Sequence, residues 1–224
     1  MIRTSLLVAA TLTALCIASP LQAQTHDASA DFSTVSNING VWSHGYTNTL
    51  GSSLNLYTRF VGGGFLMWQS ADFGRDPNFA KNTTGSNAFG TADGQVSLHP
   101  GPGNQYSVLR FTAPSTNTFT IDSQFYSGDG GDTDVNVLLN SGTASPLFFA
   151  ATTNTNPTYG ASVSLQANDT LDFVIGAKGS YAGDTTPFRV TITTGAVPAP
   201  GSLAVGLVGI VPAIGLLLRR RRKS

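Results

Sequence analysis

The stretch TFTIDSQF, residues 118–125, decides the fold class because it alternates strictly between apolar and polar side chains over most of its length. In an extended chain, Phe119, Ile121 and Phe125 fall on one face, and the intervening threonine, aspartate and glutamine residues fall on the other. A period of two with one apolar face is typical of a half-buried strand in an antiparallel sheet. The stretch therefore predicts a strand that turns one face toward a core.

The same pattern recurs along the chain between turn-forming Gly, Asn, Asp and Pro residues. Further strands are predicted at residues 106–111, 134–139, 162–165, 171–175 and 187–193. Residues 166–170 are predicted as a hairpin connection, and residues 69–95, which lack a lasting period, as a long surface excursion. No sustained helical period occurs between residues 24 and 195, so we expect an all-β fold, a two-sheet antiparallel β-sandwich of the jelly-roll type.

The N-terminal residues 1–23 have the layout of a secretory signal peptide. A short basic start that contains Arg3 precedes an apolar run over residues 6–18, and small residues follow up to Ala23, where cleavage is expected. The only cysteine, Cys16, lies in the apolar run, so the mature chain has no thiol and no disulfide. We therefore expect residues 24–195 to be an exported β-sandwich ectodomain that an ordinary hydrophobic core stabilises.

The formal net charge of zero conceals a strong asymmetry. Residues 24–200 hold six basic residues and all twelve acidic ones, which gives this part of the chain a net charge of −6. Every acidic residue is Asp, a residue that favours turns over helix interiors. With no basic patch in the exported part, nucleic acid is excluded as an expected partner.

The C-terminal sequence VPAPGSLAVGLVGIVPAIGLLLRRRRKS, residues 197–224, combines a proline-rich start, an apolar stretch and a basic end. Residues 201–218 carry no charge, and as a helix they would span about 27 Å, enough to cross a bilayer core. The basic residues that follow predict a cytoplasmic C-terminus. Residues 196–224 are therefore predicted to contain a transmembrane helix, which leaves the main domain outside the inner membrane.

This tail resembles the C-terminal signal of the PEP-CTERM family of sorted bacterial proteins, with Ala199 in place of the signature's Glu. The motif residues are Val197, Pro198, Ala199 and Pro200, followed after the apolar stretch by Arg219, Arg220, Arg221 and Arg222. The resemblance implies export by the Sec machinery, a transient stay in the inner membrane, and cleavage near the proline box by an exosortase. It also implies a Gram-negative host that makes exopolysaccharide, and a final location at the cell surface or in the extracellular matrix.

The body of the chain is similar to galactose-binding-like and carbohydrate-binding jelly rolls. The similar stretches are NGVWSHGY (39–46), LHPGP (98–102), YSVLRFTAP (106–114) and NDTLDFVIG (168–176). The resemblance implies a polysaccharide ligand, and it carries over no catalytic residue. Tyr159 and Tyr181, which lie in Gly- and Asn-rich stretches read as exposed connections, are the predicted ligand-binding aromatics. Trp42 and Trp68 are predicted core residues.

The segment SGDGGDTDVN, residues 127–136, is the one candidate for a metal site. Asp129, Asp132, Asp134 and Asn136 supply oxygen ligands of the kind that calcium prefers, although their spacing differs from an EF-hand loop. The alternative is that the first two aspartates shape a turn and the other two side chains face water. No other cofactor is expected.

No catalytic motif is present, so we expect a non-enzymatic protein. There is no Gly-x-Ser-x-Gly sequence and no metal-ligating histidine spacing, and His26 is expected in a frayed start. Two alternatives stay open. The first is a secreted polysaccharide hydrolase that uses aspartates such as Asp72, Asp76 and Asp93 with a histidine, and the second is a structural surface protein without a ligand.

Overall fold

The computed structural model describes residues 23–195, and this segment is a compact unit with its own core. Its strands are β1 (Thr25–Asp27), β2 (Trp42–Thr47), β3 (Asn55–Leu56), β4 (Arg59–Val61), β5 (Phe65–Gln69), β6 (Asn78–Asn82), β7 (Val96–His99), β8 (Tyr106–Thr112), β9 (Asn117–Phe125), β10 (Asp134–Leu139), β11 (Phe148–Ala150), β12 (Thr158–Leu165), β13 (Thr170–Gly176) and β14 (Thr186–Thr194). Over residues 23–195, no helix is long and apolar enough to cross a membrane. The predicted transmembrane helix, and the predicted signal peptide except Ala23, lie outside the described residues.

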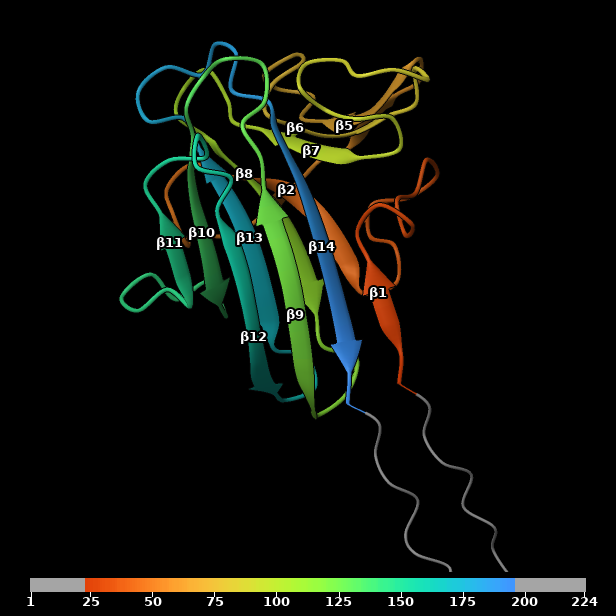
Figure 1. The fold of residues 1–224 in the computed structure, drawn as a ribbon, viewed down its shortest axis with the longest axis vertical. Helices are drawn as coiled ribbons and strands as arrows, with labels where there is room; N and C mark the ends of the chain where they lie inside the picture. Colours follow the sequence, from red (N-terminus) through yellow and green to blue (C-terminus); the bar gives the residue numbers. More distant parts are fainter. Residues whose placement is uncertain (1–22, 196–224) are drawn as a thin grey trace, which may run out of the picture. The chain divides into compact units, whose positions relative to one another are not determined.

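The strands form two antiparallel sheets that pack face to face (Figure 1). The eight-stranded sheet has the order β12-β9-β14-β7-β6-β5-β4, and β1 pairs with β14 beside this path. The six-stranded sheet has the order β11-β10-β13-β8-β2-β3. The expected all-β, two-sheet antiparallel sandwich is confirmed, and the finer assignment to a jelly roll stays a prediction.

From β7 onward the chain passes from one sheet to the other at almost every connection, and only β10 and β11 follow each other within one sheet. The predicted hairpin at residues 166–170 is wrong for this reason, because β12 and β13 belong to different sheets. The alternating pattern correctly predicted both strands. Such a pattern carries no information about which other strand each one pairs with.

The core lies between the inner faces of the two sheets. Phe119, Ile121 and Phe125 of β9 are fully buried there, as the opening stretch predicts, and the alternate residues of β9 face outward. Trp42 and Trp68 are buried core residues, which confirms their predicted role.

The outer face of the six-stranded sheet is also covered. Val108, Leu138 and Val174 form a second buried cluster on this face, and Leu50 and Leu54 from the segment between β2 and β3 pack against it. The outer face of the eight-stranded sheet is instead exposed and polar over β12 and β9.

Two short strands contradict the sequence predictions. β6 lies within the predicted surface excursion of residues 69–95, yet it pairs on both sides and buries Phe79 and Ala80. β1 places His26 opposite Ile192 of β14 and buries it, so the prediction of a frayed start is wrong. Neither segment is long enough to show a period, and both are held by pairing with distant parts of the chain.

Candidate functional site

Three connections meet at one end of the sandwich, the upper end in Figure 1, which we call the loop end. The loop end consists of the β7–β8 connection (100–105), the β9–β10 connection (126–133) and the β13–β14 connection (177–185). The backbone N–H of Gly131 donates to the carbonyl of Gly183 over 2.8 Å, which ties the second connection to the third. Three segments that are far apart in sequence therefore form one surface.

Two hollows lie side by side at the loop end and share Ala177 and Lys178. The first measures about 350 Å³ and is lined by Gly131, Asp132, Ala177, Lys178, Ser180, Ala182 and Asp184. The second measures about 310 Å³ and is lined by Asn104, Tyr106, Asp134, Gly176, Ala177, Lys178 and Gly179. Each volume lies at the lower end of the range of small-molecule sites.

Lys178 and Asp132 form an ion pair at the rim of the first hollow, with 2.5 Å between Nζ and Oδ2. The other carboxylate oxygen of Asp132 accepts a hydrogen bond from the hydroxyl of Thr152. Partial burial acts to raise the pKa of Asp132, but the hydrogen bonds from Lys178 and Thr152 outweigh it, and the pKa is lowered. Asp132 is therefore an ionised acceptor at neutral pH.

Asp184, which is not among the residues predicted from the sequence, also lines the first hollow. Asp184 is 2 % exposed, and its Oδ2 atom has no hydrogen-bond partner among the described residues. Burial, together with the nearby carboxylates of Asp129 and Asp132, raises the pKa of Asp184 to about 7. No local signal could have selected it, since its acidic neighbours lie about fifty residues away in the sequence.

The predicted calcium ligands are only partly brought together. Asp129 accepts hydrogen bonds from the backbone N–H and the hydroxyl of Thr185, at 3.0 and 3.1 Å. Asp134 lines the second hollow, and burial raises its pKa, whereas Asn136 is buried further along the outward face of β10. Within residues 23–195, no group of three or more His, Cys, Asp or Glu side chains is arranged to hold a metal ion. Calcium binding stays a prediction.

The two predicted ligand-binding tyrosines lie in different surroundings. Tyr181 is 39 % exposed in the β13–β14 connection, and its ring stands edge-on to His99 with 6.2 Å between the centroids. Tyr159 lies in strand β12, not in a connection, and its half-buried ring packs against Phe148 of β11 at 5.4 Å. The prediction of an exposed Tyr159 is therefore wrong, because the glycine after it sits inside a strand.

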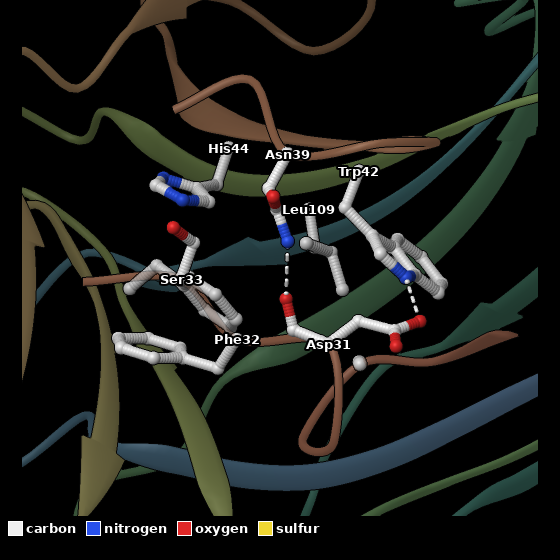
Figure 2. Close-up of a pocket in the computed structure, with 9 residues that line it drawn as sticks. Asp31, Phe32, Ser33, Asn39, Trp42, His44 and Leu109 are labelled. Atoms are coloured by element: carbon white, nitrogen blue, oxygen red, sulfur yellow. Dashed lines mark hydrogen bonds between the residues drawn. The ribbon is translucent and has the colours of Figure 1, made fainter. Parts of the chain in front are cut away.

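A separate cavity beside Trp42 and His44 is too small for an organic ligand (Figure 2). Its volume is about 10 Å³, room for about one water molecule. Asp31 closes it by accepting the indole N–H of Trp42 at 3.0 Å, while its backbone carbonyl accepts from the Asn39 amide at 2.9 Å. These contacts and its small volume make this cavity a packing feature of the core and not a ligand site.

The aspartates of the hydrolase alternative do not form one cluster. Asp72 contacts the hydroxyl of Tyr46 at 3.4 Å, and Asp76 lies 3.6 Å from the ring of His99. Both precede β6, whereas Asp93 follows it and accepts from the backbone N–H of Gly85.

No protein-family model matches the chain, and no curated protein matches it. Solved structures with some likeness include CBM51-2 in complex with GlcNAc and INT domains from Clostridium perfringens ZmpB, with 9% identity and a TM-score of 0.36. That match covers 48% of this chain and only 23% of the other. Another is a family 29 carbohydrate binding module from Piromyces equi, with 11% identity, a TM-score of 0.31, and 78% and 93% of the two chains covered. A third is CBM4, with 15% identity, a TM-score of 0.34, and 58% and 86% covered.

What the described residues define is a class, a two-sheet antiparallel β-sandwich with a hollowed, charged loop end.

Proposed function

We propose that this chain is an exported, non-enzymatic surface or matrix protein that binds polysaccharide at its loop end. The observation that carries the proposal is a hollow lined by Lys178, Asp132 and Asp184, in whose wall the partly exposed Tyr181 lies between two lining residues in the sequence. Ser180 and Ala182 line that hollow, and the ring of Tyr181, which lies between them in the sequence, packs edge-on to His99. An aromatic face packs against the C–H face of a sugar ring, while charged side chains hydrogen-bond its hydroxyl groups.

The other large surfaces of the domain suit this role less well. Away from the loop end, Leu50 and Leu54 cover Val108, Leu138 and Val174 on the outer face of the six-stranded sheet. The exposed positions of β9 and β12 carry Thr, Ser, Asp and Gly, and therefore offer no ring for stacking. The loop end combines an exposed ring, charged hydrogen-bonding groups and hollows of suitable size.

The proposal predicts that glycan binding depends on Tyr181. Tyr181→Ala should weaken binding about tenfold, because a lost aromatic contact of about 1.4 kcal/mol corresponds to that factor. Lys178→Ala should also weaken it, whereas Phe149→Ala, which removes a ring that is 55 % exposed on β11, should leave it unchanged. A glycan array and an exopolysaccharide pull-down measure these differences.

Both measurements are run with calcium and with a chelator, because Asp129 and Asp132 are predicted calcium ligands. If the wild-type protein retains no glycan in either condition, or if Tyr181→Ala binds as well as wild type, the loop end is not a glycan site. Release of sugar during the pull-down would instead favour the hydrolase alternative.

We propose delivery by the C-terminal sorting segment. The proposal rests on the proline box of residues 197–200, the uncharged stretch of residues 201–218 and the arginines that follow. In this account the Sec machinery exports the chain, the inner membrane holds it for a time, and an exosortase releases it to the surface or matrix of a Gram-negative cell.

A further inference from the structure

Strand β12 is the longest free sheet edge within residues 23–195. The eight-stranded sheet ends at β12 on one side and at β4 on the other, and the six-stranded sheet ends at β11 and β3. β12 has eight residues, whereas β4, β11 and β3 have three, three and two, and β1, which pairs on one side only, has three. Short edge strands offer little backbone for pairing, so only β12 presents a substantial template.

β12 also lacks the features that usually protect an edge. Its sequence, TYGASVSL, contains no charged residue and no proline. The edge strand β4 at the other side of the same sheet carries Arg59 and is followed by three consecutive glycines. Charge, proline and brevity are the common devices against edge-to-edge pairing, and β12 has none of them.

The backbone of β12 points alternate residues toward the free edge. The carbonyl of Pro157 accepts from the N–H of Phe125 at 3.0 Å, which fixes the hydrogen-bonded pairs between β12 and β9 at odd-numbered β12 residues. Because the hydrogen-bonding direction alternates along a strand, Thr158, Gly160, Ser162 and Ser164 direct their N–H and C=O groups outward. These are the groups that another strand can pair with.

Apolar side chains between the two sheets remain partly exposed where the sheets end, at β12 and β11. Tyr159 and Val163 of β12 and Phe148 of β11 pack against the core but remain half-buried. Their positions on the inner side of the edge strands mean that an added strand and its domain would cover them further. Apolar burial would therefore add to the backbone hydrogen bonds.

We propose that β12 pairs antiparallel with β12 of a second copy of this chain, around a two-fold axis at Ala161. In this register Thr158 lies opposite Ser164, and Gly160 lies opposite Ser162, so all four outward-directed residues are paired. A shift that centres the axis on Ser162 leaves Thr158 without a partner in the strand. Because the strand is uncharged, the register places no like charges opposite each other, which matters for a domain whose net charge is strongly negative.

A single cysteine tests the register, because residues 24–195 contain none. At the axis, the two Ala161 residues form a non-hydrogen-bonded pair, for which a Cα separation of about 4.5 Å is typical and permits a disulfide. Ala161→Cys in the segment 24–195 should give a disulfide-linked dimer under mild oxidation. The control Ser164→Cys should not, since the two introduced thiols would lie about 20 Å apart along the strands.

Ser162→Pro tests the edge without removing a bond to β9, because its N–H faces outward and an edge strand tolerates proline there. The wild-type segment should have the mass of a dimer by light scattering, and its Ser162 and Ser164 amides should exchange slowly with deuterium. Ser162→Pro should be monomeric, with circular dichroism unchanged; if it fails to fold, Ser162→Lys supplies the same test through charge.

Three results would overturn the proposal. A wild-type segment that stays monomeric at about 100 µM excludes self-pairing, even if the edge captures a strand of another protein. Equal cross-linking of the two cysteine variants excludes the register. A dimer that persists in Ser162→Pro places the interface elsewhere. None of these results depends on whether the loop end binds glycan.

Discussion

At the scale of single residues, His44 shows how burial fixes a charge state. The side chain lies beside the rings of Tyr57, Trp68 and Phe79, with centroid separations of 4.8 to 6.0 Å, and it is 4 % exposed. Burial disfavours the charged imidazolium and lowers its pKa to about 3. In the unfolded chain the same side chain takes up a proton near its ordinary pKa of 6.5. Folding thus becomes less favourable in acid.

His44→Phe should reduce this acid sensitivity while it keeps a ring of similar size in the cluster. The folded-state pKa of His44 is below its unfolded value, so the wild type loses stability as the pH falls from 6.5 toward 3. Between pH 6.5 and 4.5 the loss from this group is at most about 2 kcal/mol. Urea unfolding of both proteins at several pH values measures the difference. Parallel pH profiles for the two proteins would contradict the assignment, and the comparison at pH 8 isolates the packing effect.

At the scale of the strands, two Arg–Asp pairs join neighbouring strands in contrasting surroundings. Arg110 of β8 and Asp172 of β13 lie opposite each other and form two hydrogen bonds of 2.6 and 2.8 Å, and Asp172 also accepts from Ser141. The Asp172 side chain is 4 % exposed, whereas the Asp122 side chain, which pairs with Arg189 across β9 and β14, is 60 % exposed. Solvent screens the second pair far more than the first.

Asp172→Ala should therefore destabilise the domain by about 3 kcal/mol, because it leaves a partly buried guanidinium without its partner. Asp122→Ala, the matched control, should cost about 0.5 kcal/mol or less. Thermal and urea unfolding measure both values. A similar loss of unfolding free energy in the two variants would contradict this prediction. It would mean that the covered outer face of the six-stranded sheet does not shield the Arg110–Asp172 ion pair from water.

The strands also show how far the sequence predicts the fold. The alternating segments 118–125 and 187–193 gave β9 and β14 nearly residue for residue, whereas the segment 162–165 gave only the second half of β12. β1 and β6 were missed because their strand character comes from distant pairing, which no local pattern records. The residues of the candidate site also divide into those that the sequence predicts and those that it does not. Tyr181 and Asp132 could be selected from turn-rich sequence, but Asp184 gains its raised pKa only where two distant connections meet.

At the scale of the whole molecule, the sorting proposal predicts where the mature chain ends. In a host with a functional exosortase, the surface protein should lack Arg219 and the residues after it, because cleavage is expected near the proline box. Replacing Pro198 and Pro200 with alanine should keep the tail attached and hold the chain in the membrane. Mass spectrometry of the C-terminal peptide measures both outcomes. Mature wild-type protein that retains residues 219–224 would instead indicate a permanent membrane anchor.

The pairing of β1 with β14 has a mechanical consequence. Gln24 and Thr194 are joined by backbone contacts, so both ends of the domain leave it at the same place, whereas β14 begins at the loop end. The nine residues of β14 separate the two places by about 30 Å. A pull between a C-terminal attachment and a ligand at the loop end would thus run along the strands. The covalent backbone of β14 joins the connection that carries Lys178 and Tyr181 directly to Thr194, so that backbone would bear much of the load.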